Sequence, residues 1–440
     1  MTSEGPLLEF PRGALLVRVR KQIQDPLYRN SIFLVLNAAV PAFLGILFLK
    51  IITARFPADV VGLTSSVLTI AVMLATLSRF MDYGVLRFLP AAAEVEALTL
   101  VKLSFSVAFV LGALLSLVAI ALAPWMLRDL AFLRASPLLT LAFFVLTVGT
   151  SLSGAFDFIL IAQRATDGVF WKNSLATALR FPLPILLPLA SGLGAILWAY
   201  AASSAVGLVI SYALVRRRTS WRHSFATRSD FRSIQGRLHF TTASYIVGIL
   251  PAVQLGLTSA LVLQFFGPTQ VAAYYLAAVV MALLYVIPSS IGNILVGEGA
   301  RAQTELHRIE ARAYLLCYLI VVPAACFAAI GSDSITNLFG MHHVAGSSLL
   351  LAGLALSSIP ASFVALRLAR LRLQQQTREF TVVSVVLSAA MVSSTVLVGL
   401  LHASLEWVAL CAIVIQVAGA AYMYFQPLQW VRSQKGGFDG

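Results

Sequence analysis

Long stretches without a charged residue are the most constraining feature of this 440-residue sequence. Residues 238–297 contain no Asp, Glu, Lys or Arg. A helix crosses the roughly 30 Å hydrocarbon core of a bilayer with about 20 apolar residues. The run is far too long for one crossing and must fold back on itself, and Gly267-Pro268 supplies the turn signal near its middle. Similar uncharged runs recur along the chain.

The composition agrees with a chain that is surrounded by lipid. Hydrophobic residues make up 59% of the sequence and charged residues only 11%, whereas a soluble protein has about a quarter of its residues charged. The runs are continuously apolar rather than alternating, which favours helices over barrel strands. We predict an all-α polytopic membrane protein with about twelve spans: 31–53, 60–81, 101–125, 138–161, 174–191, 195–215, 240–265, 271–296, 312–331, 347–366, 380–401 and 406–426.

The distribution of Lys and Arg predicts the orientation in the membrane. Of the 31 basic residues, 23 fall on the side that carries both termini, and the loops of the opposite side hold only Arg55, Arg128 and Arg134. The positive-inside rule then predicts a protein of the cytoplasmic membrane with both termini in the cytoplasm. The same rule accounts for the net charge of +13, so we expect no nucleic-acid partner.

Residues 216–239 contain seven arginines and divide the spans into six and six. We predict a basic amphipathic N-terminus over 1–30, a six-helix bundle over 31–215, an Arg-rich cytoplasmic linker over 216–239, a second bundle over 240–426 and a tail over 427–440. A weak internal repeat supports two similar halves. In particular, Pro41 and Pro251 lie at equivalent points of the first helix of each half. Each proline kinks its helix and is a candidate hinge.

Charged residues within or beside spans are the candidates for binding a substrate, because a charge inside the bilayer is costly and rarely idle. Arginine suits phosphate groups because its planar fork offers two parallel donors. Structural alternatives remain for four of the candidates: Lys50 snorkels to the headgroups, Arg79 pairs with Asp82, and Asp157 pairs with Arg180. The candidate residues are Lys50, Arg79, Arg87, Asp157 and Arg180.

Polar residues at helical spacing offer a second set of candidates. Ser65, Thr69, Thr76 and Arg79 form a stripe on the second span, which fits either helix packing or a substrate path. The amides of Gln254 and Asn293 need several partners in a dry bundle, so we expect these two residues to line a cavity. The three cysteines lie in apolar spans without metal-ligand spacing, and we expect neither a metal nor a cofactor.

Two segments resemble the polysaccharide-unit flippases, often described as O-antigen or lipopolysaccharide biosynthesis proteins, of the multidrug/oligosaccharidyl-lipid/polysaccharide exporter superfamily. The first segment is Ala54-Arg-Phe-Pro-Ala-Asp-Val-Val-Gly62, followed by Arg79-Phe-Met-Asp-Tyr-Gly-Val-Leu-Arg-Phe-Leu-Pro90. The second is Phe266-Gly-Pro-Thr-Gln-Val-Ala-Ala-Tyr-Tyr-Leu-Ala-Ala278, which carries Ala272 where the family often has Gly.

The resemblance implies two bundles arranged in a V around a cationic central cavity. It further implies that alternating access moves undecaprenyl-pyrophosphate-linked oligosaccharide units across the cytoplasmic membrane for lipopolysaccharide or exopolysaccharide synthesis. The expected partners are that lipid-linked oligosaccharide, membrane lipids and other polysaccharide-assembly proteins.

Three other functions stay open. A multidrug-extrusion antiporter has the same fold, although many of its members carry an acidic residue in the first helix and span 31–53 has none. A membrane glycosyltransferase or polymerase is disfavoured by short outer loops, and there is no G-x-x-x-x-G-K-[ST] phosphate loop, so we expect a transporter and not an enzyme. A scaffold in a polysaccharide-export machine is the third.

Overall fold

The computed structural model describes residues 26–126, 130–186, 192–219, 221, 224–299, 306–374 and 376–435. These residues form a protein of α-helices joined by short turns and 3₁₀ segments, which confirms the all-α fold class. The predicted amphipathic N-terminus lies outside the described residues, except for the start of the first helix at Pro26.

The first half of the chain contributes four long helices that match predicted spans. They are α2 (Pro26–Arg55), α3 (Ala58–Leu77), α5 (Glu94–Met126) and α7 (Pro137–Ala162). A further long helix, α10 (Gly192–Arg218), follows the shorter pieces α8 (Thr166–Ala178) and α9 (Leu183–Leu186). The short helices α4 (Asp82–Phe88), η1 (Leu89–Ala91) and α6 (Phe132–Ala135) lie at the ends of spans.

The second half contributes six long helices: α12 (Leu238–Phe266), α13 (Pro268–Gly299), α14 (Leu306–Ile330), α16 (Ser347–Leu373), α17 (Thr377–Leu400) and α18 (Glu406–Lys435), with the short α15 (Ser332–Leu338) before α16. Altogether 11 helices among the described residues are long and apolar enough to cross a membrane. Each coincides with one of the predicted spans, so the described helices make a multi-pass membrane protein.

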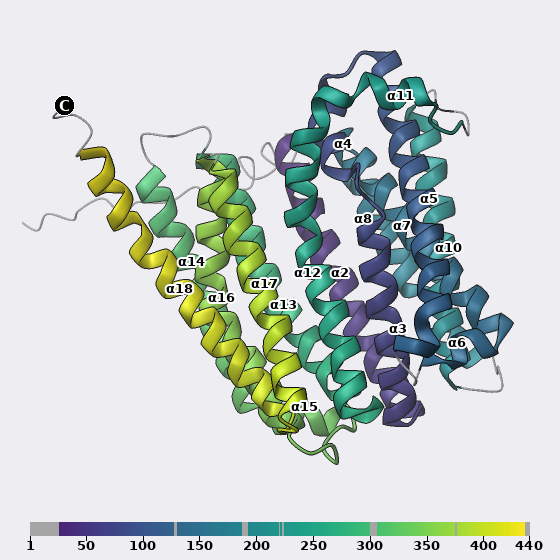
Figure 1. Ribbon diagram of the computed structural model, residues 1–440, viewed down its shortest axis with the longest axis vertical. Helices are drawn as coiled ribbons and strands as arrows, with labels where there is room; N and C mark the ends of the chain where they lie inside the picture. Colours follow the sequence, from purple (N-terminus) through teal and green to yellow (C-terminus); the bar gives the residue numbers. More distant parts are fainter. Residues whose placement is uncertain are drawn as a thin grey trace, which may run out of the picture.

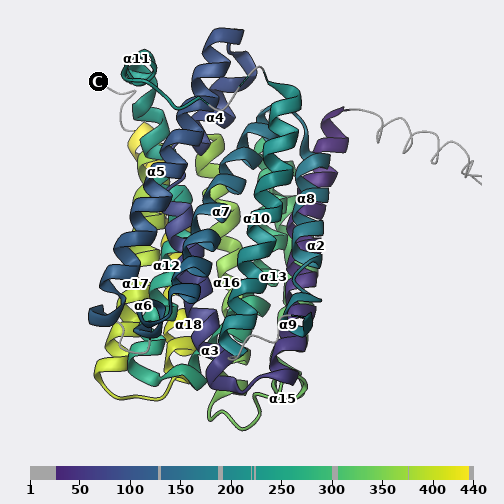
Figure 2. The same cartoon turned by 90° about the vertical axis from the view of Figure 1, so that its right-hand side faces the viewer.

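The predicted fifth span, 174–191, is not one continuous helix. The helix α8 begins eight residues earlier and ends at Ala178, and only the short α9 follows before the gap in the described residues. Pro182 and Pro184 explain the interruption, because proline lacks the N–H of the helical ladder and disfavours helical geometry in the residue before it. Figure 2 shows α8 and α9 one beyond the other alongside α2, against which α8 packs.

The helices form two groups that diverge toward one end of the molecule and converge toward the other (Figure 1). The diverging end carries α4, α11 (Arg228–Ser233) and the C-terminal end of α18, and the converging end carries α15. Between the groups lies α12, which packs against α3 of one group and against α17 of the other. The V shape that the resemblance implies is therefore present.

The two groups meet closely where α3 crosses α13. Gly62 of α3 lies against the backbone of Pro268, and a methyl group at this glycine would overlap the Pro268 carbonyl oxygen. The neighbouring Ser65 and Thr69 of α3 are buried, and each hydroxyl donates to a backbone carbonyl of its own helix. The first two residues of the predicted polar stripe thus serve helix packing, as expected for small residues in membrane bundles.

The Arg-rich segment after α10 folds back onto the first group of helices. Trp221 is 1% exposed and packs against Phe105 and Phe156 of α5 and α7. The 3-residue spacing of Thr227 and Asp230 makes a capping box at the start of α11, and the Thr227 backbone N–H bond lowers the pKa of the Asp230 carboxyl.

Candidate functional site

A cavity of about 350 Å³ lies among the helices of the second half. Its wall comes from α12, α13, α16, α17 and α18, which bring residues from five separate segments together. Most of the lining is aliphatic or aromatic, as is usual for sites that take small organic ligands. The apolar lining includes Val247, Leu250, Leu255, Met281, Leu354, Val364, Leu368, Leu387, Met391 and Val408.

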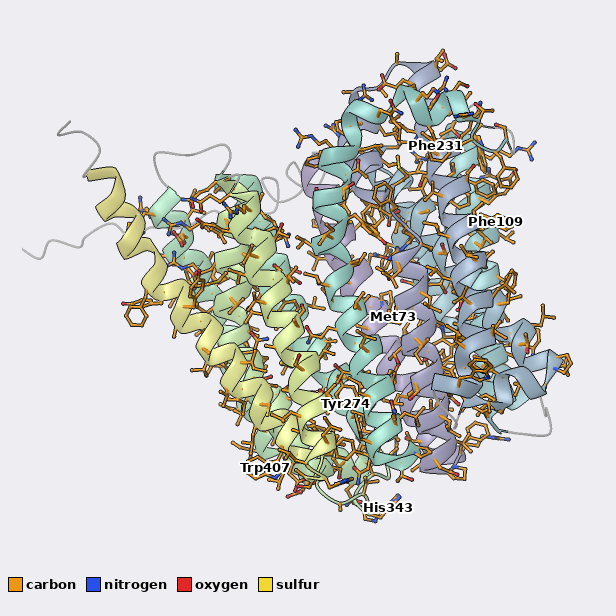
Figure 3. The ribbon with its side chains drawn as sticks, viewed as in Figure 1. Met73, Phe109, Phe231, Tyr274, His343 and Trp407 are labelled. Carbon is orange, nitrogen blue, oxygen red and sulfur yellow. The ribbon has the colours of Figure 1, made fainter. Side chains whose placement is uncertain are left out.

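A few polar groups interrupt this apolar wall. Gln254 and Thr258 project from α12, one turn apart, and Ser384 and Ser388 stand at the same spacing on α17. Tyr274 belongs to the lining near the converging end of the two groups (Figure 3). Such isolated donors and acceptors orient a ligand that is held mainly by apolar contact.

Arg372 is the only charged residue among those that line the cavity. Its guanidinium carbon lies 4.6 Å from the centre of the Phe380 ring, a cation–π distance. It also lies near Tyr285 of α13 and near Tyr83 of α4, which belongs to the opposite group of helices. Arg372 therefore stands where the cavity meets the space between the two groups.

Sequence reasoning did not select Arg372, because it was counted with the inner loop 367–379. A signal was present: Ala361, Val364, Leu368 and Arg372 step by three or four residues along α16, and all four line the cavity. The helix α16 continues to Leu373, so the arginine ends a helical stripe rather than beginning a loop.

Arg79 lies in the turn between α3 and α4 and packs on α7. Its Nε is 3.6 Å from Asp82 Oδ2, so the pair predicted from the spacing forms, although the helix is interrupted between the two residues. The guanidinium also donates to Thr76 and lies 6.0 Å from the Phe158 ring. Asp82 is 3% exposed and outside the long spans, and burial raises the pKa of its carboxyl to about 7.

Asp157 pairs with Lys172 and not with Arg180, so the structural alternative considered for Asp157 and Arg180 does not form. Lys172 Nζ lies 2.8 Å from the Asp157 carboxylate and 2.9 Å from Ser153 Oγ, and its side chain is only 1% exposed. Asn173 donates to Asp157 and to Asn37 of α2. Lys172 escaped notice because it was assigned to a loop, whereas α8 begins at Thr166 and places it inside a helix.

Arg180 occupies the break between α8 and α9. Its Nε donates to Ser203 Oγ at 3.0 Å, and its guanidinium lies 4.4 Å from the centre of the Tyr200 ring, both on α10. Tyr200 in turn shares a hydrogen bond with Tyr275 of α13. The break thus gives Arg180 a place in a chain of contacts between the two groups of helices.

The remaining candidates are widely separated. Arg87 lies at the diverging end, 4.1 Å from the centre of the Phe240 ring. Lys50 lies at the converging end, where its ammonium donates to the Leu338 carbonyl of α15 and stands 5.9 Å from the Phe339 ring. The structure therefore does not gather the five charged candidates into one site.

Of the proline and amide candidates, two line the cavity of the second half. Pro251 and Gln254 both line the cavity, and Pro41 lies inside α2. The helix α13 includes Asn293, but the side chain of Asn293 lies outside the described residues.

No protein-family model and no curated protein sequence matches the chain. Solved structures, in contrast, match the chain in fold. The chain is similar to an inward-facing MATE family multidrug resistance transporter of the MOP superfamily, with a TM-score of 0.70 and 13% identity over 91% of this chain and 98% of that one. The chain has the fold of a MOP-superfamily transporter.

Two further structures with this fold give lower scores. An outward-facing MATE family transporter has a TM-score of 0.58, with 14% identity over 95% of this chain and 98% of that one. A MOP-superfamily transporter from Pyrococcus furiosus, described as having a binding pocket of reverse polarity, has a TM-score of 0.59, with 15% identity over the same shares. The higher TM-score, 0.70 against 0.58, belongs to the inward-facing structure.

Proposed function

We propose that this protein moves amphipathic organic compounds across the membrane by alternating access, as a multidrug transporter does. The observation that carries the proposal is the mainly apolar cavity between α12, α13, α16, α17 and α18. Solved transporters of the same fold are known in inward-facing and outward-facing conformations. This reverses the order of the functions suggested by sequence, in which flipping of lipid-linked oligosaccharides came first.

The charge of the cavity bears on the class of compound. Its lining residues include Arg372 but neither Asp nor Glu. A cationic compound would enter without a counter-ion, and an unpaired charge in a poorly solvated site is costly. We therefore propose neutral or anionic amphiphiles as substrates, with Arg372 beside the anionic group.

The flipping of lipid-linked oligosaccharides is the second candidate. Arg372 favours it as well, because a guanidinium binds phosphate through two parallel hydrogen bonds. A deletion strain tests it: lipid-linked oligosaccharide should then accumulate on the cytoplasmic side, and its absence would exclude the flippase.

Transport into proteoliposomes tests the first candidate. We expect uptake of fluorescent anionic and neutral amphiphiles, and we expect Arg372→Gln to lower uptake of the anionic compound about tenfold while the neutral one changes little. A loss of about tenfold corresponds to about 1.4 kcal/mol, close to the lower end of what a hydrogen bond to a charged group contributes.

Arg378→Gln is the matched control, since Arg378 is exposed at the start of α17 and does not line the cavity. The assigned role of Arg372 would be excluded if the wild type took up cationic and anionic compounds equally well and Arg372→Gln changed neither uptake.

A further inference from the structure

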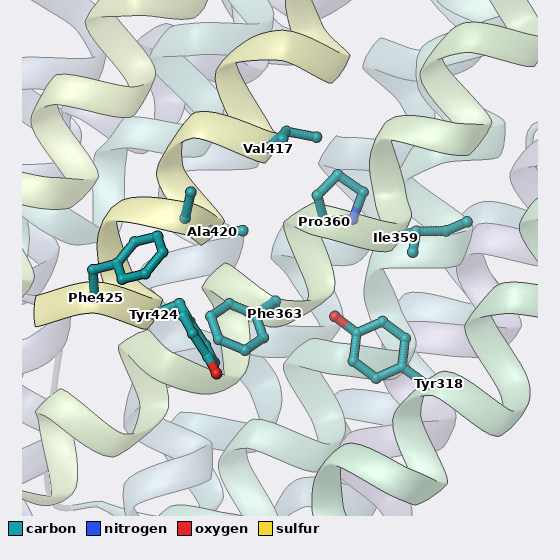
Figure 4. Close-up of a pocket in the computed structure, with 9 residues that line it drawn as sticks. Tyr318, Ile359, Pro360, Phe363, Val417, Ala420, Tyr424 and Phe425 are labelled. Atoms are coloured by element: carbon teal, nitrogen blue, oxygen red, sulfur yellow. The ribbon is translucent and has the colours of Figure 1, made fainter. Parts of the chain in front are cut away.

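A second hollow lies on the outer surface of the second half, away from the substrate cavity. It is a wide, almost wholly apolar groove of about 520 Å³ formed by α14, α16 and α18 (Figure 4). Both α14 and α18 pack on α16, and between them they leave the face of α16 around Pro360 and Phe363 open. The groove is lined by Tyr318, Ile359, Pro360, Phe363, Val417, Ala420, Ala421, Tyr424 and Phe425.

Aromatic rings mark one end of this groove. The Phe363 ring lies 5.4 Å from Tyr314 and 6.5 Å from Tyr424, measured between ring centres. Tyr424 and Phe425 are each about 60% exposed on the outer face of α18. Aromatic residues at such positions are typical of the boundary between hydrocarbon and headgroups.

Basic side chains follow directly beyond these rings. Arg367 lies one helical turn past Phe363 on α16, and its guanidinium is 5.5 Å from the Phe363 ring. Arg370 lies one turn further, and its Nη1 donates to both carboxylate oxygens of Glu310 of α14, at 2.9 and 3.0 Å. Arg367 Nη1 is 3.7 Å from the same carboxylate.

The triad of Arg367, Arg370 and Glu310 carries one positive charge in excess. Glu310 is 6% exposed and serves both arginines, while the Arg370 side chain is 32% exposed and reachable from outside. Two buried groups at this end, Arg367 Nε and the Tyr314 hydroxyl, have no hydrogen-bond partner among the described atoms. Donors with excess positive charge at the end of an apolar groove match a phosphate attached to an acyl chain.

We propose that this groove binds one anionic glycerophospholipid of the surrounding membrane, with an acyl chain against Pro360, Ala421 and Tyr424 and the phosphate at Arg367 and Arg370. The site differs from the transport cavity in its helices, in its exposure to the bilayer and in its ligand. By the predicted orientation, the bound lipid belongs to the cytoplasmic leaflet, whose anionic lipids are attracted to basic side chains.

Native mass spectrometry of the purified protein, after exchange into defined lipids, tests the proposal. With equal amounts of phosphatidylglycerol and phosphatidylcholine, the wild type should retain one phosphatidylglycerol several-fold more often than phosphatidylcholine. Arg370→Gln should abolish this preference. Ala421→Trp should lower retention of both lipids, because Ala421 is exposed and a larger side chain there fills the groove without entering the core.

Two matched variants serve as controls. Leu410→Trp places the same side chain on α18 at a lipid-exposed position beyond the groove, and Arg55→Gln removes an exposed arginine at the opposite end of the molecule. Both should retain lipid as the wild type does. Equal retention of the two lipids by the wild type, unchanged retention in Ala421→Trp, or a lipid-free dimer that closes the groove with a second copy would each overturn the assignment. Transport activity does not enter the readout, so failure here is separate from failure of the proposed function.

Discussion

A buried lysine joins three helices in the first half of the molecule. Lys172 of α8 and Asp157 of α7 form an ion pair that is nearly closed to solvent, and Asn173 extends it to Asn37 of α2. Each charge is tolerable only while its partner is present, because an unpaired charge in such a place has no solvent to replace it. The pair therefore constrains how α2, α7 and α8 are placed.

Removal of one partner should destabilise the protein strongly. We expect Lys172→Met or Asp157→Asn to lower the free energy of unfolding by about 3 kcal/mol or more, and the double variant to lose less than the sum. Thermal unfolding in detergent measures the effect. Arg308→Met, which changes an exposed arginine of α14, should leave the midpoint unchanged. Additive losses in the double variant would show that the two residues do not act as a pair.

At the scale of residues, sequence identified charges more readily than it identified their partners. Arg79 and Asp82 are three positions apart, and that local spacing was enough to predict their contact. Asp157 and Lys172 come from different helices, so their pairing depends on the rotation of each helix about its own axis. Hydrophobic periodicity does not define this rotation for α7, which is almost wholly apolar.

Single helices follow closely from the uncharged runs, because the length of a span is imposed by the bilayer. The predicted span 347–366 illustrates the remaining error. Its helix α16 continues to Leu373, since charged residues that end a hydrophobic run do not end a helix. The extra turns carry Arg367, Arg370 and Arg372, which belong to the two candidate ligand sites.

The crossing of α3 and α13 depends on the absence of a side chain at Gly62. We expect Gly62→Ala to destabilise the protein by about 1–3 kcal/mol, the usual cost of overpacking, because a methyl group there meets a backbone carbonyl that cannot rotate away. The midpoint of thermal unfolding measures the loss.

Gly45→Ala is the matched control, because Gly45 lies inside α2 with no atom close to where a methyl group would be added. Alanine is the better helix former by about 1 kcal/mol, so this variant should be neutral or slightly stabilised. If Gly62→Ala and Gly45→Ala had the same midpoint of thermal unfolding, close contact at Gly62 would not stabilise the crossing of α3 and α13.

The two groups of helices diverge at one end of the molecule and converge at the other (Figure 1), and transport by alternating access requires the reverse arrangement as well. Spin labels at Ser233 and Gln374 report on the open end, and labels at Ala54 and His343 report on the end of α15, where Figure 3 places His343. When a transported compound is added, we expect the first distance to shorten and the second to lengthen together.

Double electron–electron resonance gives both distances, in a protein whose Cys317, Cys326 and Cys411 have been replaced by alanine. A compound that the proteoliposome assay excludes is the control and should move neither distance. If transport proceeded while both distances stayed fixed, the two groups of helices would not exchange access to the two sides.

At this largest scale, sequence predicted the 11 long helices of the described residues and the wrong form only for the span 174–191, and the V came from the resemblance of two short segments. The cavity among the helices of the second half could not be predicted, because its wall combines five helices whose mutual rotations are set by packing between distant segments. Gln254 and Pro251 were selected for their residue types and proved to line it. Arg372 and Lys172 required the structure.

Helix α12 contacts both groups of helices. Along its length, α12 packs on α3, and at the same time Pro251, Gln254 and Thr258 of α12 face the cavity that α17 closes. A compound bound in the cavity would therefore contact α12, which also packs on α3 of the other group of helices. Under the proposed function, α12 and α13, which both line the cavity and both pack on α3, would link occupancy of the cavity to the contact between the two groups.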